Sequence, residues 1–463
     1  MYIKVINEKK AETNYFRFLL YLSKLVLTNV LELYIILLKK VKKREIWKRE
    51  PSQIPKGWIN MSNKKRIVNY KKFVTACTVL IILICLIGFG IKKLTNKIIS
   101  NVENVETSAK EVIIPEDKTI NLVAIGDVMC HNTNYQAAYN SSTKAYDFMP
   151  AFVNVSKYIE KGDIAIGNLE TTLTGKEVGY SGYPTFNSPE ELGVALKNIG
   201  VDVVSTANNH CMDKGTKGVI NTLDNLDKIE ISHTGTSRSK EEQDKILVKE
   251  VNGVKIAFIA FTYGTNGIKI PEGKEYLVNL IDKDLIKEQI DLAKQQNPDI
   301  ICASMHWGIE YAQKQNKNQE ELADYLFQNG VDIIIGNHAH VIEPMEKRTI
   351  TLNDGTEKDV FVVYALGNFI SAQVKEHTRS TAILDMKITK KGETGKISID
   401  SVDYVPVYCY DRGKGVQNRY ILLDVRQEMQ DFEDGKGNIS QNLYNTLKLE
   451  LQNTEKVLGE PIK

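Results

Sequence analysis

Side chains that can bind a metal ion follow several short apolar segments of this 463-residue chain. They comprise carboxylates, amides and four of the seven histidines, namely Asp127, Glu170, Asn208, Asn209, His210, His306, His338 and His340. Imidazole nitrogen, carboxylate oxygen and amide oxygen are the ligands that a borderline or hard divalent metal takes. A single histidine at the end of a strand is more often structural. Five successive strand ends with ligand-type residues favour a metal centre.

The spacing suggests how this centre would work. In an extended segment the alternation of side chains would put His338 and His340 on the same side. Two divalent ions bridged by a carboxylate would polarise a phosphoryl oxygen and lower the pKa of a bound water. His210, next to the amide of Asn209, is then the candidate for protonating the leaving oxygen or stabilising the transition-state charge. The alternative is that His210 is an ordinary ligand or a structural hydrogen-bonding residue.

The apolar segments that precede these residues predict β-strands. They are rich in β-branched residues and cover 121–127, 163–170, 201–210, 255–261, 299–307, 331–340 and 361–369. Helical patterns lie between them at 189–199, 217–226, 283–295 and 319–329. This alternation predicts an α/β layered domain with a sheet that is covered on both faces. In such a domain ligands collect at the carboxyl ends of the strands. Two later runs, 381–388 and 397–407, predict antiparallel additions.

Charge and hydropathy divide the chain. Residues 1–100 hold 21 Lys and Arg against 5 Asp and Glu, a net charge of +16, whereas the remaining residues hold 39 against 53, a net charge of −14. The segment 73–91 has no charged residue in 19 positions, which is the length that a transmembrane helix needs. More basic residues precede this segment than follow it, so the positive-inside rule places the N-terminus in the cytoplasm. The sequence thus predicts a single-pass protein of the cell membrane whose C-terminal domain is extracytoplasmic.

Composition excludes other classes. With 42% hydrophobic residues the chain can bury a core, which excludes disorder. The basic charge lies beside the apolar segment and away from the folded part, so we expect no nucleic acid as a partner. A cleaved signal peptide is disfavoured because no small-x-small site follows residue 91.

The predicted organisation has six parts. They are an extension at 1–60, a basic cytoplasmic segment at 61–72, the anchor at 73–91, a stalk at 92–119, the metal-binding domain at 120–410 and a C-terminal extension at 411–463. The extension is either a second, poor span or an amphipathic surface helix. Translation starting at Met61 is a third alternative, since Met61 opens a short basic run typical of a membrane anchor.

Eight motifs between residues 120 and 410 resemble the CapA/PgsA family of capsule-synthesis proteins in the same order. They are GDVM (126–129), GDIAIGNLE (162–170), PTFNSPEEL (184–192), TANNHCMD (206–213), HTGT (233–236), SMHWGIEY (304–311), GNHAHVIEP (336–344) and YALGNFI (364–370). The resemblance implies a calcineurin-like metallophosphoesterase sandwich and a role in making and exporting poly-γ-glutamate. It implies as metal ligands Asp127, Glu170, Asn209, His306, His338 and His340, with His210 as the catalytic residue. Residues expected around the site are Asn168, Asn208, Asp213, His233 and Asn368.

Two positions depart from that family pattern. The first motif usually reads Asp-x-His, but Met129 stands at its third position, so one metal would lack a ligand unless His131 reaches in. The bridging carboxylate is expected at Glu170, with Asn168 as its rival. The expected cofactors are therefore one or two divalent ions, with Mn, Fe, Zn and Mg all open.

Three functions remain open from the sequence. The first is assembly or export of capsule poly-γ-glutamate, with other synthase subunits and the anionic polymer as partners. The second is a metal-dependent phosphoesterase that acts on an envelope phosphate ester. The third is a non-catalytic assembly scaffold.

Overall fold

The computed structural model describes residues 115–353 and 355–463, together with isolated helical, exposed residues between 28 and 97. The chain divides into two units, Met1–Ile113 and Ile114–Lys463, and the second contains every candidate ligand. The extension at 1–60 lies mostly outside the described residues, and about half of the anchor at 73–91 does so, and both stay predictions. Among the residues that are described, we find no helix with the length and apolarity needed to cross a membrane.

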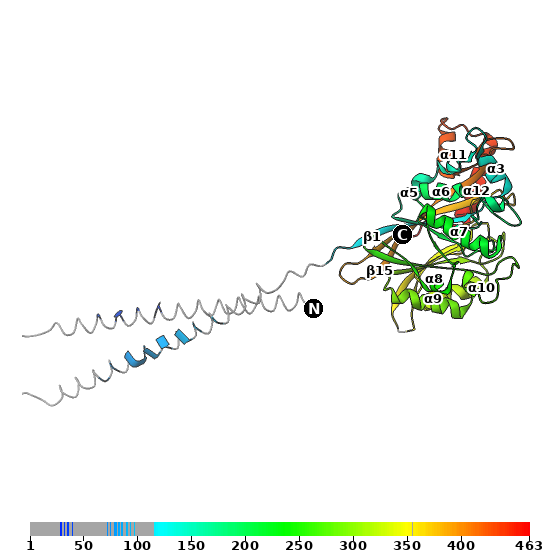
Figure 1. Ribbon diagram of the computed structural model, residues 1–463. Helices are drawn as coiled ribbons and strands as arrows, with labels where there is room; N and C mark the ends of the chain where they lie inside the picture. The colour runs from blue at the N-terminus through cyan, green and yellow to red at the C-terminus, as the bar shows by residue number, and fades with distance from the viewer. Residues whose placement is uncertain are drawn as a thin grey trace, which may run out of the picture. The chain divides into compact units, whose positions relative to one another are not determined.

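Two sheets form the centre of the unit Ile114–Lys463 (Figure 1). The first runs in the order β16 (Tyr420–Asp424), β15 (Ile397–Asp411), β14 (Ser380–Lys390), β1 (Lys118–Val128), β4 (Ile164–Leu169), β5 (Val203–Ser205) and β6 (Ser232–Thr234), with β13 (Asn368–Ile370) paired to β1. The second runs in the order β11 (Met345–Thr351), β12 (Glu357–Val363), β10 (Ile333–Asn337), β9 (Ile300–His306), β8 (Val254–Thr262) and β7 (Leu247–Val251). A separate hairpin joins β2 (Tyr139–Asn140) to β3 (Ala145–Tyr146).

Parallel strands occupy the part of each sheet that carries the ligands. In the first sheet β1, β4, β5 and β6 are parallel, and β14, β15 and β16 add to them antiparallel. The prediction of antiparallel additions at 381–388 and 397–407 is confirmed. In the second sheet β8, β9, β10 and β12 are parallel, with antiparallel strands at both edges. The carboxyl ends of the parallel strands therefore share one edge in each sheet.

Each central strand is apolar on both faces because it lies between two layers. In β1, Leu122 and Ala124 belong to the core between the two sheets, whereas Val123 and Ile125 face the other way, toward a second core. Helices cover that second core, namely α3 (Asn132–Ala138), α4 (Met149–Phe152), α5 (Ser156–Glu160), α6 (Glu191–Asn198) and α7 (Gly215–Ile229). On the outer face of the second sheet, α9 (Lys283–Gln295) and α10 (Lys317–Gln328) form a third core. The predicted α/β layered domain is thus confirmed as an α/β/β/α sandwich.

The remaining helices lie outside these main layers. They are α8 (Lys240–Asp244), α11 (Val425–Glu433), α12 (Gln441–Leu458) and the 3₁₀ turns η2 (Lys176–Val178) and η3 (Glu275–Leu277). Residues of α12 pack with β16 and the end of β15 in a small core that includes Tyr408, Leu423 and Leu447. The C-terminal residues after 411 therefore belong to the same unit as the sandwich.

Local signals explain where the helices begin. The side chain of Asp282 accepts hydrogen bonds from the backbone N–H groups of Asp284 and Leu285 and so caps α9. Asn316 and Gln319 form a capping box at the start of α10. Both caps precede a helix with one apolar face, which is why the patterns at 283–295 and 319–329 located these helices to within two residues.

Three strand predictions were too long, and the errors fall at the edge that carries the ligands. The segment 201–210 is a strand only to Ser205, the segment 331–340 is a strand only to Asn337, and the segment 361–369 is broken between β12 and β13. In the break, Gly367 has a left-handed φ of +73°, and its carbonyl oxygen accepts a hydrogen bond from the N–H of Asp127. In this break, tertiary hydrogen bonds to the ends of other strands replace the regular hydrogen bonds of a β-sheet.

Candidate metal centre

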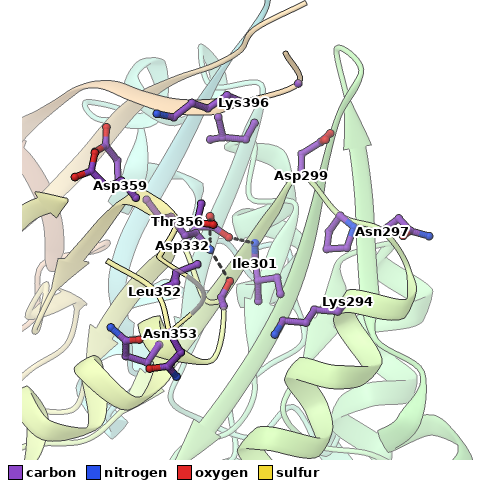
Figure 2. Close-up of a pocket in the computed structure, with 17 residues that line it drawn as sticks. Lys294, Asn297, Asp299, Ile301, Asp332, Leu352, Asn353, Thr356, Asp359 and Lys396 are labelled. Atoms are coloured by element: carbon purple, nitrogen blue, oxygen red, sulfur yellow. Dashed lines mark hydrogen bonds and ion pairs between the residues drawn. The ribbon is translucent and has the colours of Figure 1, made fainter. Parts of the chain in front are cut away.

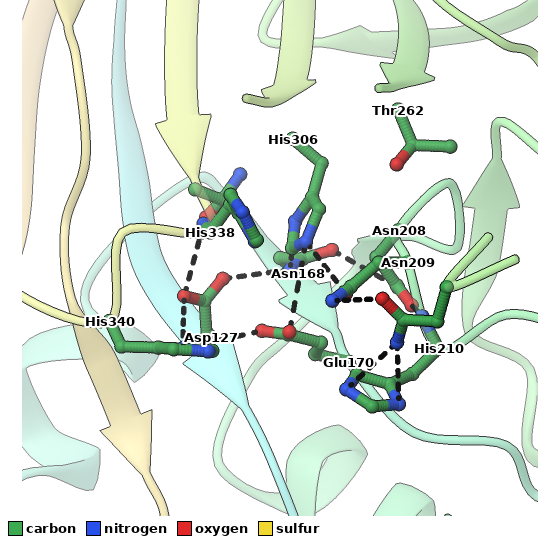
Figure 3. A network of polar contacts seen from close by, with 12 residues as sticks. Asp127, Asn168, Glu170, Asn208, Asn209, His210, Thr262, His306, His338 and His340 are labelled. Atoms are coloured by element: carbon green, nitrogen blue, oxygen red, sulfur yellow. Dashed lines mark hydrogen bonds and ion pairs between the residues drawn. The ribbon is translucent and has the colours of Figure 1, made fainter. Parts of the chain in front are cut away.

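The first sheet supplies three polar side chains that stand in register. Asp127 at the end of β1 pairs with Asn168 of β4 on one side and with Asn368 of β13 on the other. All three are buried, and the amide of Asn168 donates a hydrogen bond of 2.8 Å to Asp127 Oδ1. The register explains why Asp127 is held within a network rather than in solvent (Figure 3).

Glu170, one residue beyond β4, is the central carboxylate of the network. It is fully buried, and among the described residues neither of its carboxylate oxygens has a hydrogen-bond partner. His306 Nε2 lies 3.7 Å from Oε1, and His340 Nδ1 lies 3.9 Å from Oε2. Burial, and next the charge of Asp127, raise the pKa of Glu170 well above its usual range. A carboxylate held in this way is stabilised when a cation binds between these groups.

The second sheet brings the imidazoles. His306 ends β9, its Nδ1 lies 3.2 Å from the amide nitrogen of Asn168, and its Nε2 lies 3.0 Å from Asn209 Oδ1. Burial, and then the neighbouring imidazoles His338 and His340, hold the pKa of His306 well below its usual range. The imidazole therefore stays neutral, which is the form that binds a metal.

The expectation that His338 and His340 lie on one side of an extended segment is wrong. The strand β10 ends at Asn337, and both histidines have positive φ, +95° for His338 and +60° for His340. A turn, not strand alternation, directs their side chains into the site. The turn is held by a hydrogen bond of 3.2 Å from the N–H of His338 to Asp127 Oδ2. His340 Nδ1 lies 3.1 Å from Asn368 Oδ1.

Two overlapping groups of potential ligands share Glu170. One consists of Asp127, Glu170 and His340, the other of Glu170, His306 and His338, and the ligand atoms within each group lie within 4.8 Å of one another. His338 Nδ1, like the oxygens of Glu170, is buried and lacks a hydrogen-bond partner in the described part of the chain. Burial, followed by His340, lowers the pKa of His338 to about 4. Neutral imidazoles and unpartnered carboxylate oxygens that converge in this way fit a divalent metal.

His210 forms a pair with Asp213 beside these ligands. Its Nδ1 lies 2.8 Å from Asp213 Oδ2, and both side chains are buried. The ring packs edge-on against Phe186, with centroids 4.6 Å apart. Asn208 fixes the turn, because its Oδ1 accepts a hydrogen bond from the N–H of His210 and its amide donates to the Leu169 carbonyl. A carboxylate on Nδ1 orients an imidazole and leaves Nε2 for another group.

The structure does not bring His233 to this network. Its Nε2 lies 3.0 Å from Asp227 Oδ1, and Asp227 is also paired with Arg238. The reason is the sheet order: β6, which carries His233, is the edge strand of the first sheet, two places from β4. His131 approaches more closely, but its Nδ1 accepts a hydrogen bond from the N–H of Ala372, and its ring packs against Phe186. It belongs to none of the ligand groups found among the described residues.

Sequence reasoning missed two residues that the structure adds to the site. Glu310 forms a third group of potential ligands with His338 and His340. Asn266 accepts a hydrogen bond of 3.2 Å from the amide of Asn209, and its own amide nitrogen lies 3.5 Å from both ring nitrogens of His210. The sequence offered one indication of Glu310, because it follows the ligand-type residue His306 by four positions in the same motif. For Asn266, only its place in a loop after β8 pointed to the site.

Glu343 is a buried carboxyl just beyond the histidine turn, and it makes stability depend on pH. Gln319 donates a hydrogen bond of 2.7 Å to Oε2, whereas Oε1 has no partner among the residues described. Burial raises the pKa of Glu343 from 4.5 to about 7. Between these pH values the folded state holds more protons than the unfolded state. The free energy of unfolding therefore falls as pH rises, and above pH 7 the destabilisation caused by ionised Glu343 is constant.

We therefore expect Glu343→Gln to stabilise the protein by about 2 to 3 kcal/mol at pH 8 and by little at pH 5. Chemical denaturation of both proteins at the two pH values measures the difference. Glu321→Gln, an exposed carboxyl on α10, serves as the control and should change neither value. An equal effect of Glu343→Gln at both pH values would contradict the assignment.

A pocket lies at the edge of the second sheet opposite to the one that carries the candidate ligands (Figure 2). It has a volume of about 680 Å³ and is lined by Asp299, Asp332 and Lys358, among others, at the amino-terminal ends of β9 and β10. Asp332 accepts a hydrogen bond of 2.8 Å from the N–H of Ile301 and pairs with Lys358 at 2.9 Å. Its buried charge is thus already compensated within the fold, and these contacts are structural.

Fold and site together define the class of this protein: an α/β/β/α sandwich with a candidate binuclear metal centre where strands of both sheets end. Residues 121–373 match the family described as bacterial capsule synthesis protein PGA_cap. The chain belongs to this family, which confirms the resemblance seen in the eight motifs.

Two relatives carry related names. The capsule biosynthesis protein CapA of Bacillus anthracis is 27% identical over 284 residues, which cover 60% of this chain and 66% of the relative. The PGA biosynthesis protein CapA of Bacillus subtilis (strain 168) is 30% identical over 261 residues, which cover 54% of this chain and 64% of the relative. The similarity thus spans slightly less than two thirds of either relative.

Solved structures give weaker similarities. The NAD nucleotidase NadN of Haemophilus influenzae is 14% identical with a TM-score of 0.36, covering 74% of this chain and 61% of that chain. A phosphatase from Mycoplasma pneumoniae is 16% identical with a TM-score of 0.35, covering 62% of this chain and 93% of that chain. Neither score establishes a shared fold.

Proposed function

We propose that this protein serves the synthesis or export of capsule poly-γ-glutamate and that it does so through a metallophosphoesterase-type divalent metal centre. Membership of the PGA_cap family and the names of the two CapA relatives support the pathway. The observation that carries the metal centre is the buried, unpartnered carboxylate of Glu170 between His306 and His340. The proposed ligands are Asp127, Glu170, Asn209, His306, His338 and His340.

Four of the six proposed ligands contact a neighbouring amide side chain. Asn168 holds Asp127 and lies against His306, Asn368 lies against His340, and Asn266 accepts a hydrogen bond from Asn209. Such outer contacts set the orientation of a ligand and its basicity. Bound divalent ions would supply Lewis acidity toward a phosphoryl or carboxylate oxygen and a water of lowered pKa. The metal identity stays open among Mn, Fe, Zn and Mg.

We further propose that the segment 73–91 anchors the protein and that the domain after it lies outside the cytoplasm. The absence of charge over 19 positions and the excess of basic residues before the segment support this orientation. Capsule polymer and membrane synthase subunits are the partners that this placement favours. The net charge of −14 beyond residue 100 would repel polyglutamate, and bound divalent ions reduce that repulsion.

The test replaces the chromosomal gene in the source bacterium with one that encodes His338→Ala and His340→Ala together. We expect the surface-bound γ-linked glutamate polymer to fall at least about tenfold, because two ligands are lost. His377→Ala is the matched control, since His377 pairs with Glu450 away from the centre and its loss should leave the polymer level unchanged. The amount of protein in the membrane fraction is measured in each strain.

Normal polymer in the double variant would contradict a metal-dependent role in this pathway. Polymer loss on deletion of the gene, combined with normal polymer in the double variant, would instead support a non-catalytic scaffold. Recovery of the full-length protein in the soluble fraction would contradict the anchor.

A metal-dependent phosphoesterase is the second candidate, and the buried pair His210–Asp213 favours it. With Asp213 held on Nδ1, His210 Nε2 has only a long contact of 3.5 Å with the Asn266 amide nitrogen among the described residues and can give a proton to a leaving oxygen. We expect His210→Asn to lower kcat for a generic phosphodiester by about 10² to 10⁴. Metal content, measured by elemental analysis, should stay at the wild-type level. His131→Asn is the control, because His131 contacts Phe186 without joining a ligand group.

Two results would contradict this candidate. Absence of turnover by the metal-loaded wild type would exclude the reaction for the chosen ester class. Equal kcat for the wild type and His210→Asn would exclude His210 as the proton donor.

A further inference from the structure

Glu310 lies where a further metal ligand would stand. One of its carboxylate oxygens and one ring nitrogen each from His338 and His340 are within 4.8 Å of one another. The two histidines are buried, whereas Glu310 is exposed, so it lies on the solvent side of the centre. We propose that Glu310 is a metal ligand that closes the centre from its open side. This inference rests on the metal centre proposed above.

The loop after β9 is built so that Glu310 reaches the histidine turn. Tyr311, the next residue, donates its N–H to the carbonyl oxygen of Ala339 at 2.7 Å, and Ala339 lies between His338 and His340. Gly308 and Tyr311 have left-handed φ values of +90° and +69°. A φ of +90° is one that residues with a β-carbon rarely adopt, so the loop favours glycine at position 308. The backbone therefore holds Glu310 beside both imidazoles.

Side chains on both sides keep this loop in place. Trp307 donates its indole N–H to the Tyr364 carbonyl at 2.9 Å. The ammonium of Lys375 lies 3.6 Å from the centre of the Tyr311 ring, a cation–π contact with a different loop.

The ligand count gives Glu310 a chemical reason to bind. The group of Asp127, Glu170 and His340 offers three donors, and the group of Glu170, His306 and His338 shares one of them. Divalent ions such as Mn²⁺ take up to six ligands and prefer carboxylate oxygen. Two such ions carry four positive charges, against which Asp127 and Glu170 supply only two negative ones. A third carboxylate reduces this excess and adds an oxygen donor.

An unpartnered atom near Glu310 also fits the role of this residue as a ligand. His338 Nδ1 is buried and has no hydrogen-bond partner among the described residues, although Glu310 is close to this side chain. A hydrogen bond between imidazole and carboxylate would be the expected contact if the pair were only structural. A cation between the two groups accounts for both observations.

The experiment titrates the full-length protein, after removal of metal with a chelator, with Mn²⁺ in an isothermal calorimeter. We expect Glu310→Gln to weaken Mn²⁺ binding at least about tenfold. Glu310→Asp should recover part of the affinity, because it keeps the charge and shortens the reach by one methylene. The electron paramagnetic resonance spectrum of bound Mn²⁺ should also change in Glu310→Gln, since a direct ligand is lost. Glu321→Gln, an exposed carboxyl of α10 paired only with Lys317 at the surface, is the matched control.

The outcomes separate this inference from the proposed centre. Wild-type affinity and an unchanged spectrum in Glu310→Gln would overturn the role of Glu310 and leave the centre intact. Full wild-type affinity in Glu310→Asp, with a wild-type spectrum for the Mn²⁺ that Glu310→Gln binds, would reduce Glu310 to a long-range electrostatic effect and also overturn it. A wild type that binds none of Mn²⁺, Fe²⁺, Zn²⁺ and Mg²⁺ would overturn the centre and, with it, the role of Glu310.

Discussion

Replacing Glu170 with glutamine is expected to weaken metal binding strongly at both halves of the metal centre. Both halves use the same carboxylate, so one substitution removes a ligand from each. At a Mn²⁺ concentration about 100 times the wild-type Kd, binding stabilises the wild type by about 2.7 kcal/mol. If the affinity falls about 100-fold, the same concentration stabilises Glu170→Gln by only about 0.4 kcal/mol. Thermal unfolding with and without Mn²⁺ measures both values.

The metal-free Glu170→Gln protein should unfold at a temperature no lower than the wild type at pH 8. The reason is that the substitution removes a buried carboxylate whose charged form is disfavoured by burial and by Asp127. Glu343→Gln is the matched control, because it also neutralises a buried carboxyl but belongs to no ligand group in the described chain. A metal-induced stabilisation of wild-type size in Glu170→Gln would disprove the shared-ligand centre.

Replacing Gly126 or Gly336 with alanine is expected to destabilise the fold strongly. The segment 364–367 crosses the ends of β1 and β10, and its carbonyl oxygens approach both glycines. A β-carbon on Gly126 would lie 2.0 Å from the oxygen of Gly367, and one on Gly336 would lie 1.9 Å from the oxygen of Tyr364. Both oxygens belong to the backbone, so no side-chain rotation relieves the overlap. We expect a loss of about 3 kcal/mol or more, since overpacking of this kind forces the backbone to shift.

Denaturant unfolding measures that loss, and Gly264→Ala provides the control. A β-carbon on Gly264 would meet no atom of the described residues within 4 Å. Its substitution should change stability by less than about 1 kcal/mol. If Gly126→Ala keeps wild-type stability and wild-type Mn²⁺ affinity, the close packing of segment 364–367 against β1 is wrong. Normal stability with weakened Mn²⁺ binding would show that the strand moves and carries Asp127 with it.

Strand and helix patterns predicted the layers well because their signal is local. Each central strand alternates between two apolar cores, so almost every residue in it is apolar, as in Ile120–Ile125. The helices α9 and α10 combine one apolar face with a strong N-terminal cap, and such features lie within a few residues of one another. The same signal did not show that the strands divide into two sheets. That division depends on pairing between distant segments, such as β13 with β1.

The ligand types were readable from the sequence, but the geometry around them was not. Asp127, Glu170, His306, His338 and His340 follow apolar segments, and the carboxyl ends of parallel strands meet at one edge, so their approach was predictable. The turn that carries His338 and His340 was not, because positive φ at these residues is imposed by tertiary hydrogen bonds rather than by their own preference. The place of His233 outside the site was not predictable either, because it depends on a tertiary contact with Asp227 of α7.

Sequence alone thus determined the layered class, the kind of ligands and the family, because these depend on residue type and order. Tertiary structure alone decided that Glu310 joins the histidine turn and that Asn266 lies against Asn209 and His210. Those contacts join residues far apart in the chain, and a few ångströms decide whether they form. Local preferences fix the elements of this protein, whereas long-range packing of backbone against backbone fixes its candidate metal centre.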